Sequence, residues 1–435
     1  MILSKNNILY YDYKNNIRFI VKEYFSNFSP KVKSLEEAIN KINEYFYIYN
    51  DFNKYGITTN KLGNSEDILY CDKTYNEFES KFTSLILSIL NSYNPEKFIN
   101  TKYYQLLKNY QKSIISTDKM AKIYYEFSKF TNKQEFPFSK ILDYLNERQS
   151  TLKNTEYISY SNYIKKKIGI NSDFIDTIIK NNIAPLKIVT ISEEKIEYNL
   201  SAAKNIIYEI LKDYYDINIL TKLLDSIYIS TTRSGTVVAY GEIPIINIYS
   251  DNKSVDIIVL AHELGHAYHY YCNEENEIEN FGSRSDFSEA FAIATQLIVA
   301  DSLRFKNAII RDYNNFYCDT LHSLKIALYI EEHQKELTET MLKEKFEDYK
   351  NYYRFILDNF YDYYYFIGFI AGNILSKKIV ANKYSKETLK QKLAFNSNSS
   401  LIEIFKLFDI NIANEKDLIK YIQFINEYYQ NLVHN

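Results

Sequence analysis

Hydrophobic Leu and Ile residues are interspersed with Lys, Glu and Asn over long stretches of the first 155 residues, and few Pro or Gly residues interrupt them. This pattern favours long helices. Residues 34–37, Ser-Leu-Glu-Glu, match a capping box, in which the Ser and Glu side chains satisfy backbone N–H groups of a first helical turn. We therefore predict one helix from there to about residue 56 and a second over residues 65–91. Together, residues 1–155 are expected to form a helical N-terminal region.

The pattern changes after about residue 186. Residues 186–191 are predicted to form a short strand, and residues 201–215 a helix. Three stretches rich in β-branched and aromatic residues follow, separated by Gly235 and Gly241: 226–232, 236–241 and 244–250. Such side chains suit a pleated surface and Gly suits the turns, so we expect a small antiparallel sheet. Six of the nine glycines lie from Gly235 onward, which concentrates tight backbone geometry in the C-terminal half.

The composition is that of a soluble globular protein. Hydrophobic residues make up 46% of the chain, the mean hydropathy is −0.35 and the net charge is −3. This balance suggests neither nucleic acid nor a membrane as a partner. The chain has 44 Tyr and no Trp, so much of the core is expected to carry hydroxyl groups that need partners.

Cysteine usage and the N-terminal residues indicate a cytoplasmic protein. Cys71, Cys272 and Cys318 are widely spaced and form no CxxC motif, as in proteins whose thiols stay reduced. The N-terminus lacks the continuous apolar segment of a signal peptide. The longest apolar run, residues 363–375, has about 13 residues, fewer than the roughly 20 that a membrane span requires.

The motif with the clearest chemistry is His-Glu-Leu-Gly-His at residues 262–266, which has the form HExxH. It lies on a helix predicted over residues 255–269, and Ser254 is expected to cap this helix. His262 and His266 are four residues apart and share one helix face, so their imidazoles can bind one Zn²⁺ at about 2.0–2.1 Å each. Glu263 is displaced from that face and suits the role of general base toward a water molecule. The motif therefore predicts one catalytic zinc ion per chain.

A catalytic zinc site needs a third protein ligand and one open position. Glu289 is the best candidate, because it lies on a second predicted helix in which alternating Ala residues permit close packing. The competing carboxylates belong to a polar connecting segment, where solvated charge is the simpler interpretation: Glu274, Glu275, Glu277 and Glu279.

Two further residues are candidates for the surroundings of the metal. His269 follows His262 and His266 on the same stripe, and we expect it to pack beside the site, since a fourth protein ligand would leave no position for water. Asp286, one turn before Glu289, is expected either to accept a hydrogen bond from a ligand His or to cap the second helix.

Several of these segments together resemble oligoendopeptidase F and its relative thimet oligopeptidase, which are zinc metallopeptidases. Residues 262–269, HELGHAYH, have the form HExGHxxH, and residues 286–290 are similar to the third-ligand helix of that family. Similarity extends to residues 233–236, 244–247 and the tyrosine-rich segment 360–368. The resemblance covers roughly residues 155–380 and does not include residues 1–155.

The resemblance implies a mainly α-helical, zincin-like fold of two lobes, with a small β-sheet beside the active-site helix and a deep central channel. Residues 156–435 would then form the catalytic region of an oligopeptidase-type endopeptidase that acts on short peptides. The strand beside the zinc helix is expected to bind the peptide substrate as an added strand through residues of one short segment: Gly235, Thr236, Val237, Val238 and Ala239.

The resemblance also implies that a tyrosine hydroxyl near the zinc donates a hydrogen bond to the developing oxyanion. Tyr363 best matches the family's catalytic tyrosine, and Tyr361 and Tyr365 are alternatives.

Two positions depart from the family's pattern. Phe355 stands where the family has a His that helps bind the tetrahedral intermediate, and Gln296 stands where a Glu often follows the third ligand. Two other functions therefore stay open. A zinc metallocarboxypeptidase would need a basic group for the substrate's C-terminal carboxylate, for which Arg233 and Arg284 are candidates. A catalytically weakened relative would bind peptides without cleaving them.

Overall fold

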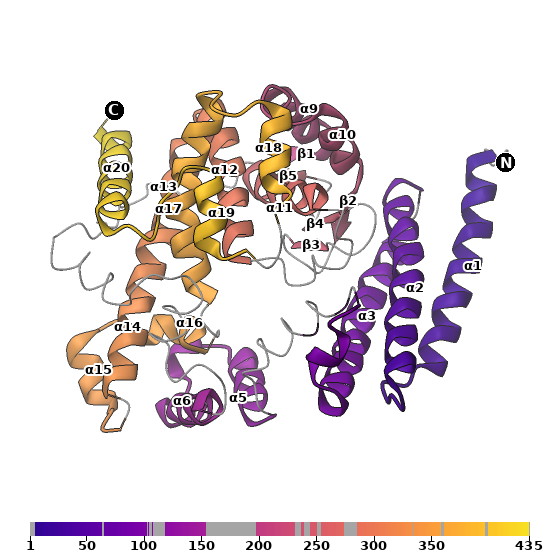
Figure 1. The fold of residues 1–435 in the computed structure, drawn as a ribbon, viewed down its shortest axis with the longest axis horizontal. Helices are drawn as coiled ribbons and strands as arrows, with labels where there is room; N and C mark the ends of the chain where they lie inside the picture. Colours follow the sequence, from indigo (N-terminus) through magenta and orange to yellow (C-terminus); the bar gives the residue numbers. More distant parts are fainter. Residues whose placement is uncertain are drawn as a thin grey trace. The chain divides into compact units, whose positions relative to one another are not determined.

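The fold is mainly α-helical, as expected (Figure 1). The structure is a computed structural model, and it describes residues 5–62, 65–101, 103, 107, 118–153, 197–230, 236–238, 244–249, 254–273, 285–333, 335–357, 361–395 and 399–434. The strand predicted at residues 186–191 lies outside this part of the chain. None of the described helices is long and apolar enough to cross a membrane.

The chain divides into two compact units that interleave along the sequence. Unit 1 consists of Met1–Gln111, Lys195–Ser283 and Asn382–Ser397, and unit 2 of Lys112–Glu194, Arg284–Ala381 and Asn398–Asn435. Residues 1–155 therefore contribute to both units. The division of roles between residues 1–155 and 156–435 stays a prediction, as does the deep central channel.

Unit 1 contains an N-terminal helical group, a set of short strands and the helix that carries the HExxH motif. Its elements are, in chain order, α1 (Lys5–Asn27), α2 (Leu35–Leu62), α3 (Ser65–Ser92), η1 (Pro95–Phe98), β1 (Glu197–Asn199), α9 (Leu200–Leu211), α10 (Ile217–Asp225), β2 (Ile227–Ser230), β3 (Thr236–Val238), β4 (Ile245–Tyr249), β5 (Ser254–Asp256), α11 (Ile257–Cys272) and α18 (Lys386–Leu393).

The two predicted N-terminal helices are confirmed as α2 and α3, but α2 does not end near Gly56. The Ser34 hydroxyl accepts a hydrogen bond from the Glu37 N–H at 3.0 Å, as the sequence predicted for the start of α2. Gly56 lies inside α2, where α3 packs against it. A Cβ at this position would meet the Tyr75 hydroxyl of α3. This glycine therefore permits close helix packing and does not mark a helix end.

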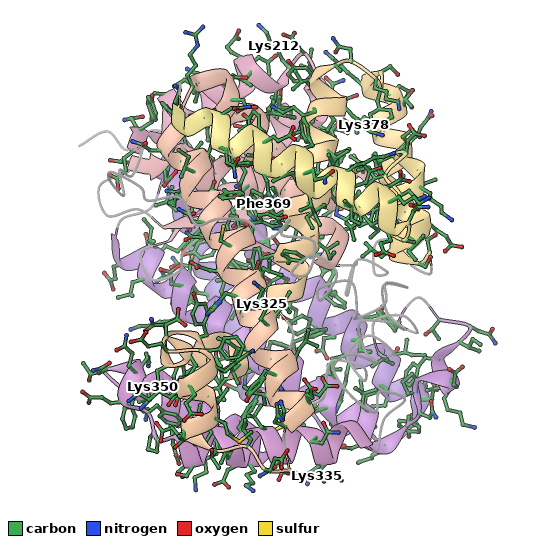
Figure 2. All side chains as sticks on the ribbon, turned by 90° about the vertical axis from the view of Figure 1, so that its left-hand side faces the viewer. Lys212, Lys325, Lys335, Lys350, Phe369 and Lys378 are labelled. Carbon is green, nitrogen blue, oxygen red and sulfur yellow. The ribbon has the colours of Figure 1, made fainter. Side chains whose placement is uncertain are left out.

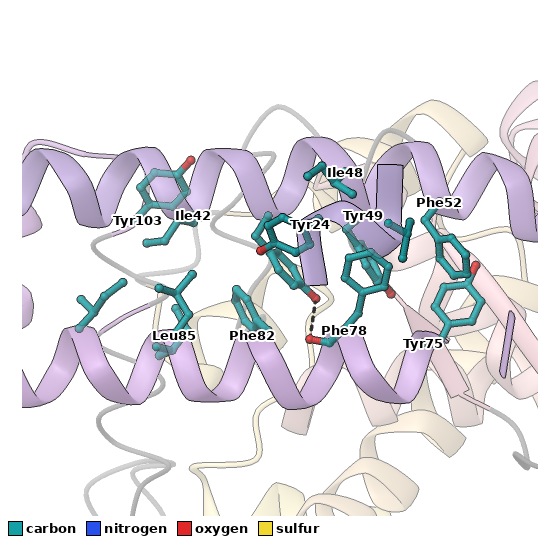
Figure 3. Close-up of a cluster of buried hydrophobic side chains, with 14 of the residues drawn as sticks. Tyr24, Ile42, Ile48, Tyr49, Phe52, Tyr75, Phe78, Phe82, Leu85 and Tyr103 are labelled. Carbon is teal, nitrogen blue, oxygen red and sulfur yellow. Dashed lines mark hydrogen bonds between the residues drawn. The ribbon is translucent and has the colours of Figure 1, made fainter. Parts of the chain in front are cut away.

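The core between α1, α2 and α3 is rich in aromatic rings (Figure 3). Phe78 contacts Phe52 at a ring separation of 5.4 Å, and it contacts Tyr49 edge-on at 5.1 Å. The Tyr45 hydroxyl donates to the Phe78 carbonyl at 3.4 Å. Tyr228 of β2 joins this core and donates to Asp72 at 2.9 Å. Many core residues thus carry hydroxyl groups, as the composition indicated, and these Tyr45 and Tyr228 hydroxyls have acceptors.

The small sheet is mixed, and the prediction of a purely antiparallel sheet is wrong. β3 pairs with β4 in the antiparallel sense, but β2 pairs with β4 in parallel, in the order β2-β4-β3. β4 therefore lies between β2 and β3, and it runs in the same direction as β2 and opposite to β3. A separate antiparallel pair joins β1 to β5, immediately before α11.

Unit 2 is formed by helices in the part of the chain that the structure describes. Its elements are α5 (Asp118–Lys129), η2 (Lys133–Glu135), α6 (Phe138–Lys153), α12 (Ser285–Leu303), α13 (Lys306–Tyr313), the π-helix η4 (Asn314–Asp319), α14 (Thr320–His333), α15 (Glu339–Lys345), η5 (Tyr349–Tyr352), α16 (Tyr353–Leu357), α17 (Tyr361–Val380), α19 (Leu401–Leu407) and α20 (Glu415–His434).

Two glycines of α17 allow it to pack closely against α12. A Cβ at Gly368 would lie 3.0 Å from the Glu289 Cβ, and a Cβ at Gly372 would lie 2.8 Å from the Ala290 carbonyl oxygen. Because such distances leave no room for a side chain, these glycines and the small Ala290 set how closely the two helix backbones approach. The backbone around Glu289 is thereby held by α17.

Candidate metal centre

The HExxH helix α11 is anchored at both ends. Asp256 caps it, because its carboxylate accepts hydrogen bonds from the N–H groups of Ile258 at 2.9 Å and Val259 at 3.3 Å. The prediction that Ser254 caps this helix is wrong, since Ser254 lies in β5, where it pairs with β1. Near the other end of α11, the Tyr268 hydroxyl oxygen accepts a hydrogen bond from the backbone N–H of Asp216, which precedes α10, at 2.9 Å.

The two histidines of the motif face each other across one helical turn. His262 Nε2 and His266 Nε2 are 3.1 Å apart. Two nitrogens on a tetrahedral ion with bonds of 2.0–2.1 Å would be separated by about 3.3 Å. Burial lowers the pKa of His266 well below its ordinary 6.5, and the neighbouring His262 lowers it further. His266 is therefore neutral at physiological pH, which is the state that binds a metal.

Glu263 and Glu289 are both buried carboxylates, with exposures of 7% and 6%. Glu289 lies on α12 and offers one carboxylate oxygen to a group whose other members are the two histidines. The ligand atoms of His262, His266 and Glu289 all lie within 4.8 Å of one another, a spacing that a single ion can bridge. Glu263 is not a member of this group, which agrees with a role other than metal binding.

His269 is fully buried beside the motif and has a different set of neighbours. Its Nε2 lies 3.0 Å from the Asn273 side-chain nitrogen, and its ring stacks on Phe395 at 5.3 Å. The Asn273 amide donates this hydrogen bond, so His269 Nε2 is the accepting nitrogen of a neutral imidazole. Burial lowers the pKa of His269 to about 3.

The buried His269 is expected to make the fold less stable in mild acid. The unfolded chain protonates this residue near pH 6.5 but the folded chain only near pH 3, so below pH 6.5 the unfolded state holds one more proton. Stability contributed by neutral His269 is present above pH 6.5 and falls by up to about 1.4 kcal/mol per pH unit on acidification. Urea unfolding of chelator-treated wild type and His269→Gln between pH 7 and pH 5 measures this. Equal slopes for the two proteins would contradict it.

The tyrosine segment forms the beginning of α17. Tyr361 and Tyr363 lie in its first turn, and their side chains are outside the described part of the structure. Tyr365 is half-buried, and its ring stacks on Phe316 of the π-helix η4 at 5.1 Å, with 9° between the planes. The choice among the three tyrosines stays a prediction. No motif or hydrophobic pattern in the sequence indicates the π-helix or singles out Phe316.

The strand expected to bind substrate is confirmed as a strand over residues 236–238. β3 is a terminal strand of its sheet, since β4 is its one partner among the described strands, and both β3 and β4 pack on α11. Gly235 and Ala239 lie outside the described residues, as do the side chains of β3. Among the described strands none pairs with the other edge of β3, which is the edge that an added peptide strand would use, and the binding itself stays a prediction.

The remaining predicted positions have separate outcomes. Asp286 is the second residue of α12 as described, and its side chain lies outside the described part, so both of its expected roles stay predictions. Gln296 is buried and donates a hydrogen bond to Asp312 at 2.9 Å. A Glu at this position would face the Asp312 carboxylate, which explains how the structure accommodates an amide here.

Phe355 lies in α16, and Arg233 and Arg284 are outside the described residues.

Comparison with known proteins identifies the fold. No known family profile matches the sequence, and no curated protein matches it. Among solved structures, a protein of Chlamydophila abortus assigned as a peptidase has a TM-score of 0.54 at 14% identity, covering 91% of each chain. A protein of Bacillus anthracis assigned as an oligoendopeptidase F has a TM-score of 0.52 at 12% identity, covering 96% of this chain and 95% of its own. A Pyrococcus furiosus carboxypeptidase has a TM-score of 0.53 at 14% identity, covering 88% and 98%. The chain therefore shares its fold with these proteins.

Proposed function

We propose that this protein is a zinc-dependent endopeptidase that hydrolyses short peptides, with His262, His266 and Glu289 as zinc ligands and Glu263 as general base. The observation that carries the proposal is the approach of three ligand atoms to within 4.8 Å of one another. The donor set of two imidazoles and one carboxylate is that of catalytic zinc in peptidases, and it leaves a fourth position for water. The fold shared with proteins assigned as peptidases supports the same conclusion.

The proposal assigns one role to each part of the site. Zinc bound by the three ligands would lower the pKa of a water molecule toward about 7 and polarise the scissile carbonyl. Glu263, buried next to His262, takes the proton from the attacking water and delivers it to the leaving amine. A tyrosine of α17, Tyr363 in the first instance, donates a hydrogen bond to the developing oxyanion. The edge of β3 holds the peptide main chain beside α11.

Metal analysis combined with mass spectrometry of a peptide-library digest tests this proposal. We expect one zinc per chain, cleavage of internal peptide bonds, loss of cleavage with a chelator and recovery when zinc is returned. Cleavage that persists after complete metal removal would exclude the mechanism.

The same digest separates the proposal from its alternatives. A Pyrococcus furiosus carboxypeptidase shares the fold, which makes removal of single C-terminal residues the second candidate. A ladder of products shortened from the C-terminus would assign that activity, whereas fragments from internal cleavage would assign an endopeptidase. Bound zinc without any cleavage would instead indicate a peptide-binding protein.

A further inference from the structure

A groove in the N-terminal helical group of unit 1 has no role in the proposed hydrolysis. It lies between α1 and α3 and encloses about 450 Å³, a volume within the range of small-ligand sites. We call it the α1–α3 groove. Its lining includes Arg18, Val21, Lys22 and Phe25 of α1 and Tyr70 and Glu77 of α3.

The α1–α3 groove offers apolar surface between its charged groups. Val21 is buried, and Phe25 is half-buried, with its ring against Phe78 of the aromatic core at 4.8 Å. The Thr74 hydroxyl, which also lines the groove, donates to the Tyr70 carbonyl at 2.7 Å and is therefore already engaged. An apolar side chain of a ligand could lose contact with water here by packing on Phe25.

The Arg18 guanidinium is held in a fixed orientation in this lining. It donates to the Tyr55 hydroxyl at 3.1 Å and to the Asp67 carboxylate at 2.7 Å. It also lies over the Tyr70 ring, 4.0 Å from the ring centre. These contacts leave other N–H groups of the guanidinium for a ligand, and its planar shape matches a carboxylate. An oriented guanidinium loses little conformational freedom when it binds an anion.

The Arg18 end of the groove is positively charged. Lys14 and Arg18 share the buried Asp67 carboxylate, so one negative charge faces two positive charges. Lys22 lines the groove one turn after Arg18 and is exposed, which adds a further positive charge. This end therefore suits an anionic group of a ligand.

The acidic residue of the lining lies farther along the groove. The helices α1 and α3 run in the same direction, because Arg18 contacts Tyr70 whereas the later Phe25 contacts Phe78. Glu77 follows Tyr70 by seven residues, so its level is roughly 10 Å from that of Arg18 at the rise of an α-helix. An extended tripeptide spans about the same 10 Å between its charged ends.

We propose that the α1–α3 groove binds a short peptide with free termini, in the first instance a tripeptide, whose carboxylate pairs with Arg18 and Lys22 and whose ammonium pairs with Glu77. An apolar side chain of this peptide packs on Phe25. Glu77 also pairs with Lys81 at 3.5 Å, so the ammonium contributes less to binding than the carboxylate. The inference goes beyond the proposed hydrolysis, because a peptide in this groove is bound and not cleaved.

Tryptophan fluorescence can report occupancy of this groove by itself. The chain has no Trp, so Phe25→Trp places a single indole in the lining of the groove. The full-length variant is mixed with trileucine in a stopped-flow instrument. With about 1 µM protein, a turnover of about 10 s⁻¹ would consume only about 10 µM peptide per second, so millimolar trileucine is not depleted even if the protein cleaves it.

We expect a saturable change in indole emission and a strong dependence on the peptide's C-terminus. Trileucine should bind about 10–100-fold more tightly than its C-terminal amide, as a hydrogen bond to a charged group would give. N-acetyl-trileucine should bind about two- to fivefold more weakly than trileucine, since Glu77 is exposed and shared with Lys81. Calorimetry on wild type with the same peptides should give the same order of affinities.

Substitutions in the Phe25→Trp background assign each contact. Arg18→Met should reduce the acid-to-amide ratio to about one, and Lys22→Gln should reduce it about two- to fivefold. Glu77→Gln should abolish the effect of N-acetylation. The control Lys335→Gln removes an exposed lysine of unit 2, beyond the end of α14 (Figure 2), and should leave the ratio unchanged.

The outcomes are independent of the proposed function, because the signal arises in the groove and requires no cleavage. No change in emission with trileucine, or equal affinity for the acid and the amide, would overturn the inference even if the protein is a peptidase. Emission that instead changes with protein concentration would assign the groove to a second copy of the chain and would also overturn it. Thermal melting shows whether each variant is folded. If Arg18→Met is unfolded, the exposed positions Lys22 and Glu77 still decide the result.

Discussion

Glu263→Gln is expected to lower kcat for peptide hydrolysis about a thousandfold while zinc stays bound. Gln has nearly the same shape as Glu, so the packing of this buried position on α11 is retained. It cannot accept a proton, and general acid–base groups typically contribute 10²- to 10⁴-fold to rate. Because Glu263 is outside the group of three ligand atoms, metal affinity should change little. Steady-state kinetics on a cleaved peptide, with zinc content measured on the same samples, checks both parts.

The contrast between activity and metal content makes this variant informative. A variant that loses zinc together with activity would show that Glu263 supports the ligands and would leave the general base unidentified. A variant that keeps wild-type kcat would remove Glu263 from the mechanism. Glu209→Gln, which changes an exposed glutamate of the same unit, controls for the loss of one negative charge.

The sequence predicted those features that depend on neighbouring residues in the chain. The capping box at residues 34–37 and the long segments without Pro predict α2 and α3 within a few residues, except that α2 continues past Gly56 to Leu62. The spacing of His262 and His266 predicted two imidazoles on one face, and their Nε2 atoms are 3.1 Å apart. These results follow from the helical repeat alone, which does not depend on the rest of the fold.

Features that depend on tertiary packing were not predictable in this way. Gly56, Gly368 and Gly372 lie inside helices at points where a second helix approaches closely. No local sequence pattern distinguishes such glycines from glycines that end a helix. The parallel pairing of β2 with β4 depends on where the chain crosses the sheet, whereas the composition of the strands is the same for either direction. Asp256, and not the predicted Ser254, caps α11, because pairing with β1 extends the preceding strand β5 through Ser254.

Glu289→Gln is expected to weaken zinc binding at least about 100-fold. Substitution of groups that only orient a metal ligand typically costs 10- to 100-fold in metal affinity, so loss of a charged ligand should reach or exceed that range. The neutral amide keeps the volume of the side chain against Gly368, so the packing of α12 on α17 should be preserved. Competition with a chromophoric chelator measures the affinity, and Ser288→Ala, at the adjacent buried position, is the matched control.

The result for Glu289 also decides between this residue and the alternatives that the sequence left open. Glu274, Glu275, Glu277 and Glu279 belong to a segment outside the described residues, and each carries a carboxylate that is close to the HExxH helix in sequence. If Glu289→Gln kept wild-type affinity, the third ligand would have to be sought among them, and the helix contact at Gly368 would have no part in the metal site. If affinity falls while the Ser288 control is unchanged, the carboxylate itself is required. The close packing of α12 on α17 at Gly368 would then contribute to metal binding, because it fixes the position of the Glu289 ligand.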